Sequence, residues 1–333
     1  MGKQIGIDLG TANTLIYQKG RGIVLRSPSV VAIDRLTGQL IAAGARAKQM
    51  LGKTPTNIIA YKPLKDGVIA DIDVTTLMLN DFMRKCDLIS TFNRPSILVC
   101  VPQGVTTVER RAVENAAYDA GARTVATMLE PMAAAIGVGM DVLAPEGNMI
   151  VDIGGGTTEI AVISLGGIVS NKSIKMAGDD LTNDIVEYMR RQHNIRVSER
   201  MAERIKINVG SALSILEDAP EDFEVCGPNQ MTALPMKVPV SYQEIAHCLD
   251  KSISKIEAAV LSALEQTPPE LYADIVKNGI YLAGGGALLR GIDKRLRDKM
   301  GIEFHVADDP LHAVARGTGI ALKNIDKFNF LIR

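Results

Sequence analysis

Two short stretches of this chain combine an aspartate, a glycine turn and hydroxyl side chains. The first is Asp8-Leu9-Gly10-Thr11-Ala12-Asn13, and the second is Asp152-Ile153-Gly154-Gly155-Gly156-Thr157. A glycine turn can expose backbone N–H groups toward an anion, and a carboxylate can orient the waters that Mg²⁺ keeps around itself. Each stretch therefore predicts a phosphate clamp, with Asp8 or Asp152 on the side of the metal ion.

The two stretches are laid out alike. Each follows an apolar run typical of a strand, at residues 5–9 and 149–153, and each leads into further strand character and a second glycine turn. Taken alone, either stretch could be an ordinary hairpin whose aspartate stabilises the turn. Their repetition favours two structurally related halves that face one ligand from opposite sides.

A third glycine stretch, Gly284-Gly285-Gly286-Ala287, follows an apolar run at residues 280–283. We expect a helix to begin near Ala287, so that free N–H groups and the positive end of the helix dipole suit a phosphate, or a closely packed ribose and base. A plain strand-to-helix turn would look the same. The stretch Gly52-Lys53-Thr54 is not the end of a P-loop, because Ala47 stands where that motif needs its first glycine.

Alternating strand and helix patterns must position these stretches, and they predict an α/β fold. Strands are expected at 97–101, 124–128 and 160–163, and helices at 45–51, 71–86, 131–137, 181–192, 198–216 and 242–266. Thr106 or Thr107 should cap a helix that runs to Gly121, with Glu109 in its first turn. Residues 222–240 are expected to be rich in strands.

Composition narrows the class of protein. A chain of 333 residues, 47% of them hydrophobic, predicts about two domains with a large core. Its 37 basic and 38 acidic residues nearly balance, which argues against a dedicated nucleic-acid binder. The scattered cysteines and histidines favour reduced thiols over disulfides or a zinc site. No apolar run approaches the ~20 residues that a membrane-spanning helix needs.

Together the three glycine stretches resemble the phosphate-1, phosphate-2 and adenosine motifs of the actin, sugar-kinase and heat-shock chaperone ATPase superfamily. Within it, the chain is similar to the MreB family of bacterial actins along nearly its whole length. The stretches that carry this resemblance include residues 6–14, 63–71, 130–137, 203–206 and 267–271.

The resemblance implies an actin-like (ribonuclease H-like) duplicated α/β fold, with two domains that each contain an A and a B subdomain around a nucleotide cleft. Domain I would comprise residues 1–136 plus 318–333, with subdomain IB at about 32–62. Domain II would comprise residues 137–317, with subdomain IIB at about 181–242.

The same resemblance assigns ATP and Mg²⁺ to the cleft, with Asp8 and Asp152 holding Mg²⁺ mostly through water. The residues implied to hold the nucleotide are Thr11, Ala12, Asn13, Gly154, Gly155, Gly156, Glu203, Arg204, Ile205, Lys206, Gly284, Gly285, Gly286 and Ala287. Of these, Glu203 and Lys206 would face the adenosine. An ordinary solvated pair one helical turn apart would have the same spacing.

Glu130 resembles the water-activating glutamate of the family, with Thr157 beside the attacking water. An ordinary glutamate, with a pKa of about 4.3, is a weak base. Phosphoryl transfer depends mainly on positioning and charge neutralisation. We therefore expect Glu130 to orient the water more than it deprotonates it. Many relatives carry a second glutamate where this chain has Leu129.

The resemblance further implies a slow ATP hydrolase that polymerises with itself into actin-like filaments and maintains rod cell shape. The filaments would lie on the inner face of the cytoplasmic membrane and direct cell-wall synthesis through membrane-embedded elongation proteins. A sugar- or acetate-type kinase of the same superfamily is the alternative, and a chaperone-type ATPase is a third interpretation.

A membrane contact is expected in the loop before Pro95. Its apolar side chains are Leu88, Ile89 and Phe92, and basic residues on both sides would favour anionic lipids. The alternative is that the same three side chains belong to the core.

Overall fold

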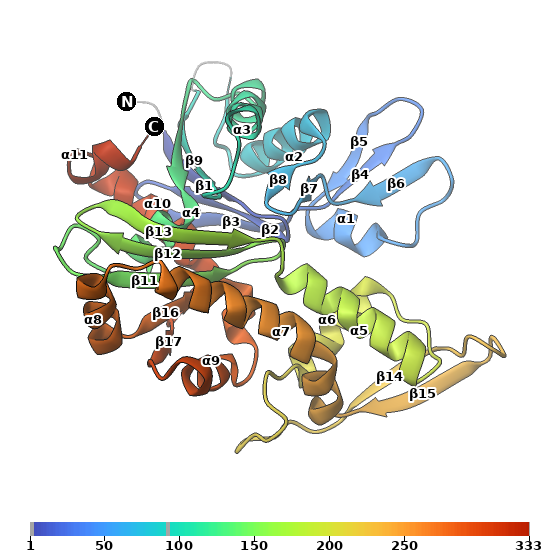
Figure 1. Cartoon of the computed structure of the whole chain (residues 1–333). Coiled ribbons are helices and arrows are strands. Elements are labelled where there is room, and N and C mark those ends of the chain that lie inside the picture. The colour runs from blue at the N-terminus through green and yellow to red at the C-terminus, as the bar shows by residue number, and fades with distance from the viewer. Residues whose placement is uncertain (1–2, 91–93, 333) are drawn as a thin grey trace.

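The computed structural model describes residues 3–90 and 94–332. Two five-stranded sheets form its centre (Figure 1). The first sheet contains β1 (Gln4–Leu9), β2 (Asn13–Gln18), β3 (Gly22–Pro28), β9 (Ser96–Val101) and β10 (Thr124–Leu129). The second contains β11 (Asn148–Ile153), β12 (Thr158–Ser164), β13 (Gly167–Ile174), β16 (Ile280–Ala283) and β17 (Phe304–Val306).

The two sheets have the same layout. Their strand orders are β10-β9-β1-β2-β3 and β13-β12-β11-β16-β17. In each, three antiparallel strands joined by tight turns continue into two parallel strands. The duplication expected from the two aspartate stretches is therefore present in the backbone.

Helices cover both faces of each sheet. Between the sheets lie α4 (Glu130–Gly137) and α10 (Ala313–Lys323), whose alanine-rich sides share one core with both sheets (Figure 1). The outer face of the first sheet packs on α2 (Ile72–Lys85) and α3 (Thr107–Asp119). The outer core of the second sheet includes α5 (Gly178–Gln192), α6 (Glu199–Val209), α7 (Tyr242–Glu265) and α9 (Ile292–Met300). Burial on both faces explains the unbroken apolar run of β9.

The chain passes from the first half to the second through α4 and returns through α10, and the two helices touch at glycines. A Cβ on Gly137 would overlap the carbonyl oxygen of Ala313, and one on Gly317 would overlap that of Ala133. Arg316 Nε also donates to the carbonyl oxygen of Gly137, at 2.8 Å. The backbones at this crossing are therefore as close as they can pack.

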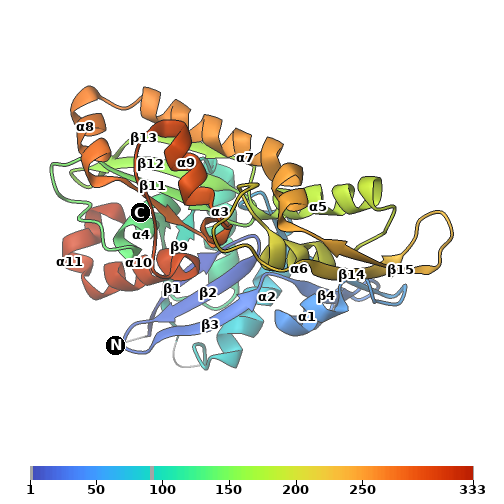
Figure 2. The ribbon, with the colours of Figure 1, turned by 90° about the horizontal axis from the view of Figure 1, so that it is seen from below.

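Two smaller units project from the same side of the molecule (Figures 1 and 2). One contains β4 (Val31–Asp34), β5 (Leu40–Ala43), β6 (Ile58–Tyr61) and α1 (Ala45–Met50) around a small apolar core. The other contains α5, α6 and the hairpin of β14 (Phe223–Pro228) and β15 (Pro235–Val240). The predicted division into domains I and II stays a prediction.

Short elements complete the chain. They are β7 (Leu64–Lys65), β8 (Val68–Ile69), α8 (Pro269–Asn278), α11 (Ile325–Phe328) and the 3₁₀ turns η1 (Gly285–Leu288), η2 (Pro310–His312) and η3 (Asn329–Leu331). Within the described residues, no helix combines the length and apolarity needed to cross a membrane.

The expected helix caps are confirmed for α3. The Thr106 hydroxyl accepts from the Glu109 N–H, and the Glu109 carboxylate accepts from the Thr106 N–H, which completes a capping box. Asp71 caps α2 in a similar way by accepting from the Val74 N–H.

Two helix boundaries differ from the expectation. The helix predicted over 198–216 ends at Val209, because Gly210 adopts an extended conformation. The helix expected near Ala287 begins at Ile292 instead. The third glycine stretch itself forms most of the 3₁₀ turn η1, and the left-handed Gly291, with φ of 72°, separates that turn from α9. The stretch therefore does not lead directly into an α-helix.

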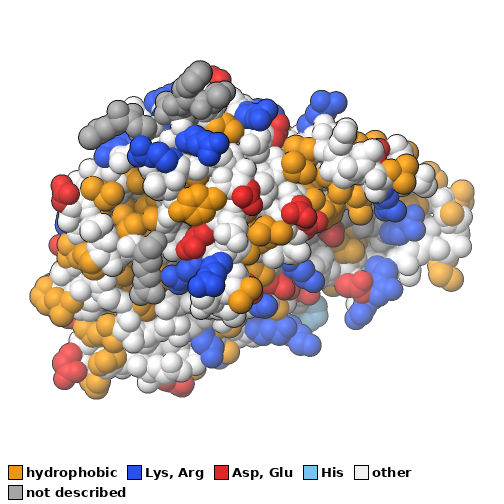
Figure 3. Space-filling model, turned by 90° about the horizontal axis from the view of Figure 1, so that it is seen from above, with side chains coloured by type: hydrophobic (Ala, Val, Ile, Leu, Met, Phe, Trp, Pro, Cys, Tyr) orange, Lys and Arg blue, Asp and Glu red, His pale blue; other side chains and the backbone are white. Residues whose placement is uncertain are grey.

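The expected membrane contact of Leu88 is wrong in this structure. Leu88 is fully buried in the core beneath the first sheet, and its N–H donates to the Met83 carbonyl oxygen at 2.9 Å. Ile89 packs partly on the same core and lies against Gly121. Phe92 lies outside the described residues. Lys and Arg side chains are spread over the face in Figure 3, but Leu88 does not reach the surface beside them.

Candidate functional site

The two predicted phosphate clamps meet face to face. The first is the turn between β1 and β2, and the second is the turn between β11 and β12. A Cβ on Gly155 would lie 2.7 Å from the Ala12 Cβ, and one on Gly156 would lie 2.7 Å from Thr11 Oγ1. The close approach of the first turn excludes side chains at Gly155 and Gly156. Neither glycine has a positive φ, so backbone conformation is not the reason.

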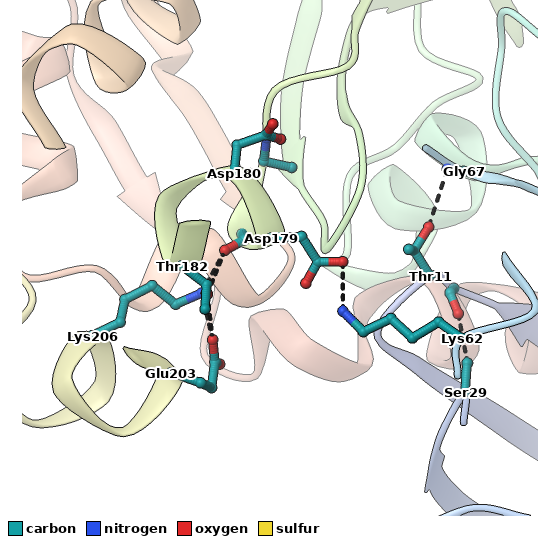
Figure 4. Close-up of polar contacts among 12 residues, drawn as sticks. Thr11, Ser29, Lys62, Gly67, Asp179, Asp180, Thr182, Glu203 and Lys206 are labelled. Carbon is teal, nitrogen blue, oxygen red and sulfur yellow. Dashed lines mark hydrogen bonds and ion pairs between the residues drawn. The ribbon is translucent and has the colours of Figure 1, made fainter. Parts of the chain in front are cut away.

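Hydrogen bonds hold the first turn from behind. Ser29 Oγ donates to the Gly10 carbonyl oxygen at 2.6 Å, and the Ser29 N–H donates to the Ala12 carbonyl oxygen at 3.1 Å. Thr11 Oγ1 accepts from the Gly67 N–H at 3.0 Å (Figure 4). The turn is therefore preformed, with Asn13 as the first residue of β2.

The second turn is held by the first turn of α5. The Gly178 N–H donates to the Gly154 carbonyl oxygen at 3.1 Å, and the Asp179 N–H donates to the Gly155 carbonyl oxygen at 2.8 Å. The glycine turn and the start of α5 therefore form one connected unit.

Four carboxylates lie at the ends of β1, β10 and β11 and at the start of β12. They belong to Asp8, Glu130, Asp152 and Glu159. Burial raises the pKa of Asp8 to about 7. Burial, followed by the charges of Asp8 and Glu159, raises the pKa of Asp152 to about 7. Burial, followed by Asp8, Glu159 and Asp152, holds the pKa of Glu130 well above its usual range. Burial also raises the pKa of Glu159 and is the largest cause of the shift in all four carboxylates, which indicates a poorly solvated site.

This donor set fits a magnesium ion. Mg²⁺ prefers oxygen ligands and keeps several waters, and buried carboxylates at one site need positive charge. Within residues 3–90 and 94–332, no group of three or more Asp, Glu, His or Cys side chains is arranged to hold a metal ion by itself. An ion held by Asp8 and Asp152 would thus need water and phosphate oxygens to complete its shell.

We expect the protein without nucleotide or Mg²⁺ to lose stability as the pH rises from about 4 to about 7. An unfolded aspartate has a pKa of about 3.9, and that of Asp8 in the folded state is about 7. Across this range the folded state binds more protons, so the free energy of unfolding falls with pH. The melting temperature should therefore be higher at pH 6 than at pH 8.

Asp8→Asn should raise the melting temperature at pH 8 and reduce its dependence on pH, as measured by differential scanning fluorimetry. Asp326→Asn, a change on the exposed α11, is the control and should leave the dependence intact. An Asp8→Asn protein with an unchanged pH dependence would contradict the assignment of this carboxylate.

Thr157 lies against the first half of the molecule. A Cβ on Gly67, in the turn between β7 and β8, would lie 3.0 Å from Thr157 Cγ2 and 3.2 Å from Pro102 Cγ. The Gly67 N–H bonds to Thr11. Thr157 thus lies against Gly67, the residue that bonds to the first phosphate turn, and its place beside the attacking water stays a prediction.

The third glycine stretch lies directly beside the second turn. A Cβ on Gly284 would overlap the Asp152 carboxylate, and one on Gly286 would overlap the Ile153 side chain. Gly284 also has φ of 78°, a conformation that favours glycine. All three predicted glycine stretches are therefore brought together, although Ala287 itself is buried.

Glu203 and Lys206 are more than a solvated pair (Figure 4). Lys206 Nζ lies 2.7 Å from Glu203 Oε2, 2.7 Å from the Gly178 carbonyl oxygen and 2.9 Å from Thr182 Oγ1. Burial would raise the pKa of Glu203, but the charge of Lys206 and hydrogen bonds from Lys206 and Thr182 lower it. The pair thus joins α6 to the first turn of α5, behind the second phosphate turn.

The two residues between them face elsewhere, as helix geometry requires. Ile205 is fully buried in the outer core of the second sheet, so its side chain packs away from solvent, and its predicted part in holding the nucleotide stays a prediction. The Arg204 guanidinium lies over the Phe223 ring, 5.4 Å from its centre, and so points toward β14.

An ion pair that the sequence did not suggest crosses between the two smaller units. Lys62 Nζ, after β6, lies 2.7 Å from Asp179 Oδ2 in the first turn of α5 (Figure 4). The Asp179 N–H also donates to the Gly155 carbonyl oxygen, so one partner of the ion pair is bound to the second phosphate turn. It ties the two sides of the site together.

Breaking this pair should release nucleotide faster. A partly exposed ion pair contributes ~0.2–1 kcal/mol, so Lys62→Ala or Asp179→Ala should speed dissociation of a fluorescent ATP analogue by a factor of about 1.4 to 5. The double variant should dissociate no faster than the faster single variant, and stopped-flow fluorescence would measure all three. Lys85→Ala, which breaks the Asp81 pair on α2, is the control. Additive effects of the two changes would rule out the coupling.

Comparisons with known proteins agree with this geometry. The family model described as MreB/Mbl protein matches residues 2–330. The chain is 51% identical to the cell shape-determining protein MreB of Escherichia coli (strain K12) over 328 residues, 97% of this chain and 94% of that protein. It is 49% identical to the cell shape-determining protein Mbl of Bacillus cereus over 325 residues, 98% of this chain and 97% of that protein.

Solved structures confirm the predicted actin-like α/β fold. The crystal structure of MreB5 of Spiroplasma citri bound to AMPPNP matches with a TM-score of 0.93 and 39% identity, covering 98% of both chains. A MamK double helical filament matches with a TM-score of 0.80 and 20% identity, covering 97% of this chain and 99% of that chain, and shows the same fold.

Proposed function

Because this chain belongs to the MreB/Mbl protein family, we propose that it is a cytoskeletal ATPase whose nucleotide lies between the two glycine turns. One observation carries this proposal: two related halves each present an aspartate and a phosphate turn, and the turns meet face to face. The Spiroplasma citri relative, whose structure holds AMPPNP, supports the choice of nucleotide.

In this proposal, backbone N–H groups at Thr11, Ala12 and Asn13 and at Gly155 and Gly156 bind the phosphate oxygens. The Gly154 N–H donates to the Thr157 carbonyl oxygen at 2.9 Å, so Gly154 contributes by shaping the second turn around them. Asp8 and Asp152 hold Mg²⁺ through its waters, and the bound ion supplies the positive charge that neutralises the phosphates. Such turns suit anions because their N–H groups point at the ligand.

The attacking water is oriented by Glu130, with Thr157 on the opposite turn beside it. The raised pKa of Glu130 adds a second capability, since a carboxylate with a higher pKa is a better proton acceptor. Glu203 and Lys206 hold the adenosine side of the cleft by fixing α6 on α5.

The assembled form is proposed to be a head-to-tail filament, because a contact between two different surfaces does not close on itself and so propagates. The filament structure of MamK, which has the same fold, is compatible with such an assembly. The filaments would lie on the inner face of the cytoplasmic membrane and direct membrane-embedded cell-wall elongation proteins, in keeping with the names of the relatives as cell shape-determining proteins. Leu88 is not part of that membrane contact.

A sugar- or acetate-type kinase of the same superfamily is not favoured, since the family match covers nearly the whole chain. Sedimentation and light scattering of the purified protein with Mg²⁺ and ATP, together with phosphate release, separate the two functions. We expect ATP-dependent filaments and turnover without an added acceptor. Turnover that requires a small-molecule acceptor, or a protein that stays unassembled with ATP on a lipid monolayer, would overturn the proposal.

A further inference from the structure

Glu159 is a buried carboxylate to which the motifs assign no role. It is the second residue of β12 and stands opposite Asp152 in the β11–β12 register, so the two side chains lie on the same face of the sheet. The residue is only 2% exposed. Burying a charge costs several kcal/mol, and an apolar residue would be more stable there. Stability therefore does not explain this carboxylate.

Its hydrogen bonds join the two halves of the molecule. Ser173 Oγ, on β13 of the second sheet, donates to Glu159 Oε1 at 2.5 Å. The Gln103 N–H, in the turn after β9 of the first sheet, donates to Glu159 Oε2 at 3.3 Å. One carboxylate thus holds the end of a strand in the first half against the hairpin that carries the second phosphate turn.

That strand end is the immediate neighbour of Glu130. Strands β9 and β10 are parallel, and Val101 pairs with Leu129 in their register. Glu130 follows Leu129 and Gln103 follows soon after Val101, so the two residues leave the sheet side by side. Anchoring Gln103 therefore anchors the backbone next to Glu130.

The same turn borders the terminal-phosphate end of the site. Pro102, directly before Gln103, and Thr157 both contact the Gly67 position of the β7–β8 turn. The side-chain oxygen Oε1 of Gln103 is buried and accepts no hydrogen bond within the described residues. Such an acceptor is costly unless a donor such as water is present.

We propose that Glu159 is a positioning residue for ATP hydrolysis. By holding Gln103 across the two halves, it keeps Glu130 aligned with the phosphate turns, and the Gln103 side-chain oxygen receives a hydrogen bond from a water in the same space. The inference rests on the proposed ATPase function. The hydrogen bond from the Gln103 N–H to Glu159 links the two halves, so it exists only while they are in contact.

Glu159→Gln tests this role because the amide keeps the size and shape of the side chain but removes the charge that accepts both hydrogen bonds. We expect kcat for ATP hydrolysis to fall about tenfold, while the Kd of a fluorescent ATP analogue changes less than twofold. A residue that only supports nucleotide binding would instead raise Kd or KM and leave kcat intact. Glu187→Gln, on the exposed side of α5, is the matched control.

Ser173→Ala provides a second variant that keeps the charge and removes one partner, and we expect its kcat to fall by a smaller factor. It keeps the inference testable if Glu159→Gln does not fold. A wild-type protein that hydrolyses ATP, with both variants at the wild-type kcat, would overturn the role of Glu159 and leave the proposed function standing. A wild-type protein that hydrolyses no ATP would instead overturn the proposed function, and the inference with it.

Discussion

Glu130→Ala should reduce kcat for ATP hydrolysis by about 100-fold or more, which is the scale of a lost general base or water-positioning group. ATP binding should persist, because the phosphate turns do not depend on this side chain. Filament assembly with ATP should persist as well, and the filaments should be longer lived. Phosphate release and sedimentation would measure both effects.

Glu130→Gln then distinguishes orientation from proton transfer. From the sequence we expected orientation to dominate, since an ordinary glutamate is a weak base. Burial is the largest cause of the raised pKa of Glu130, ahead of the charges of Asp8, Glu159 and Asp152, and a carboxylate with a higher pKa is a better proton acceptor. We therefore expect Glu130→Gln to lose nearly as much activity as Glu130→Ala.

A glutamine variant close to the wild-type rate would show that Glu130 only orients the water. A normal rate in Glu130→Ala would remove the residue from the hydrolysis site altogether. Glu265→Gln, at the exposed end of α7, controls for the change of charge.

Gly137→Ala should be strongly destabilising, as should Gly317→Ala on the other side of the same helix crossing. The added Cβ would overlap the Ala313 carbonyl oxygen, and rigid helix backbone on both sides leaves no side chain to move away. Forced overpacking typically costs ~1–3 kcal/mol and occasionally more, and we expect the upper end of this range.

Thermal or urea unfolding would measure the loss, with Gly167→Ala as the control. Gly167 has only the Ser164 carbonyl oxygen nearby, 3.6 Å from an added Cβ, and should tolerate the change. Equal stabilities for the two variants would contradict the close contact of α4 with α10. Nucleotide affinity of Gly137→Ala should also fall, because α4 and α10 link the two halves.

Patterns within a short stretch of chain were sufficient to predict much of the architecture. The repeat of aspartate, glycine turn and strand predicted two structurally related halves, and Thr106 with Glu109 predicted a helix start. These features depend on neighbours in sequence, where hydrogen bonding and hydrophobic periodicity act directly.

Contacts between distant residues could not be predicted in this way. Lys62 and Asp179 lie 117 positions apart, and nothing local marks either as half of a pair. Leu88 illustrates the reverse problem, because an apolar residue near a loop has the same sequence signature whether it meets lipid or core. Only the packing of α2 on the first sheet distinguishes the two.

Glu159 could have been found from the hairpin alone. An antiparallel pair with a tight turn after Asp152 brings Glu159 opposite that aspartate, and two carboxylates on one buried face are unusual. The missing information was its partner Gln103, which belongs to the other half of the chain.

The two facing turns show how a duplicated fold accommodates a ligand that has no symmetry of its own. Thr11 and Ala12 keep their side chains, and Gly155 and Gly156 opposite them leave the space that those side chains occupy. Two copies of the first turn would collide where their side chains meet, and two copies of the glycine turn would leave a gap between them. The divergence between the copies is therefore a form of complementarity, and it makes the space around the two turns asymmetric although the halves that carry them are related.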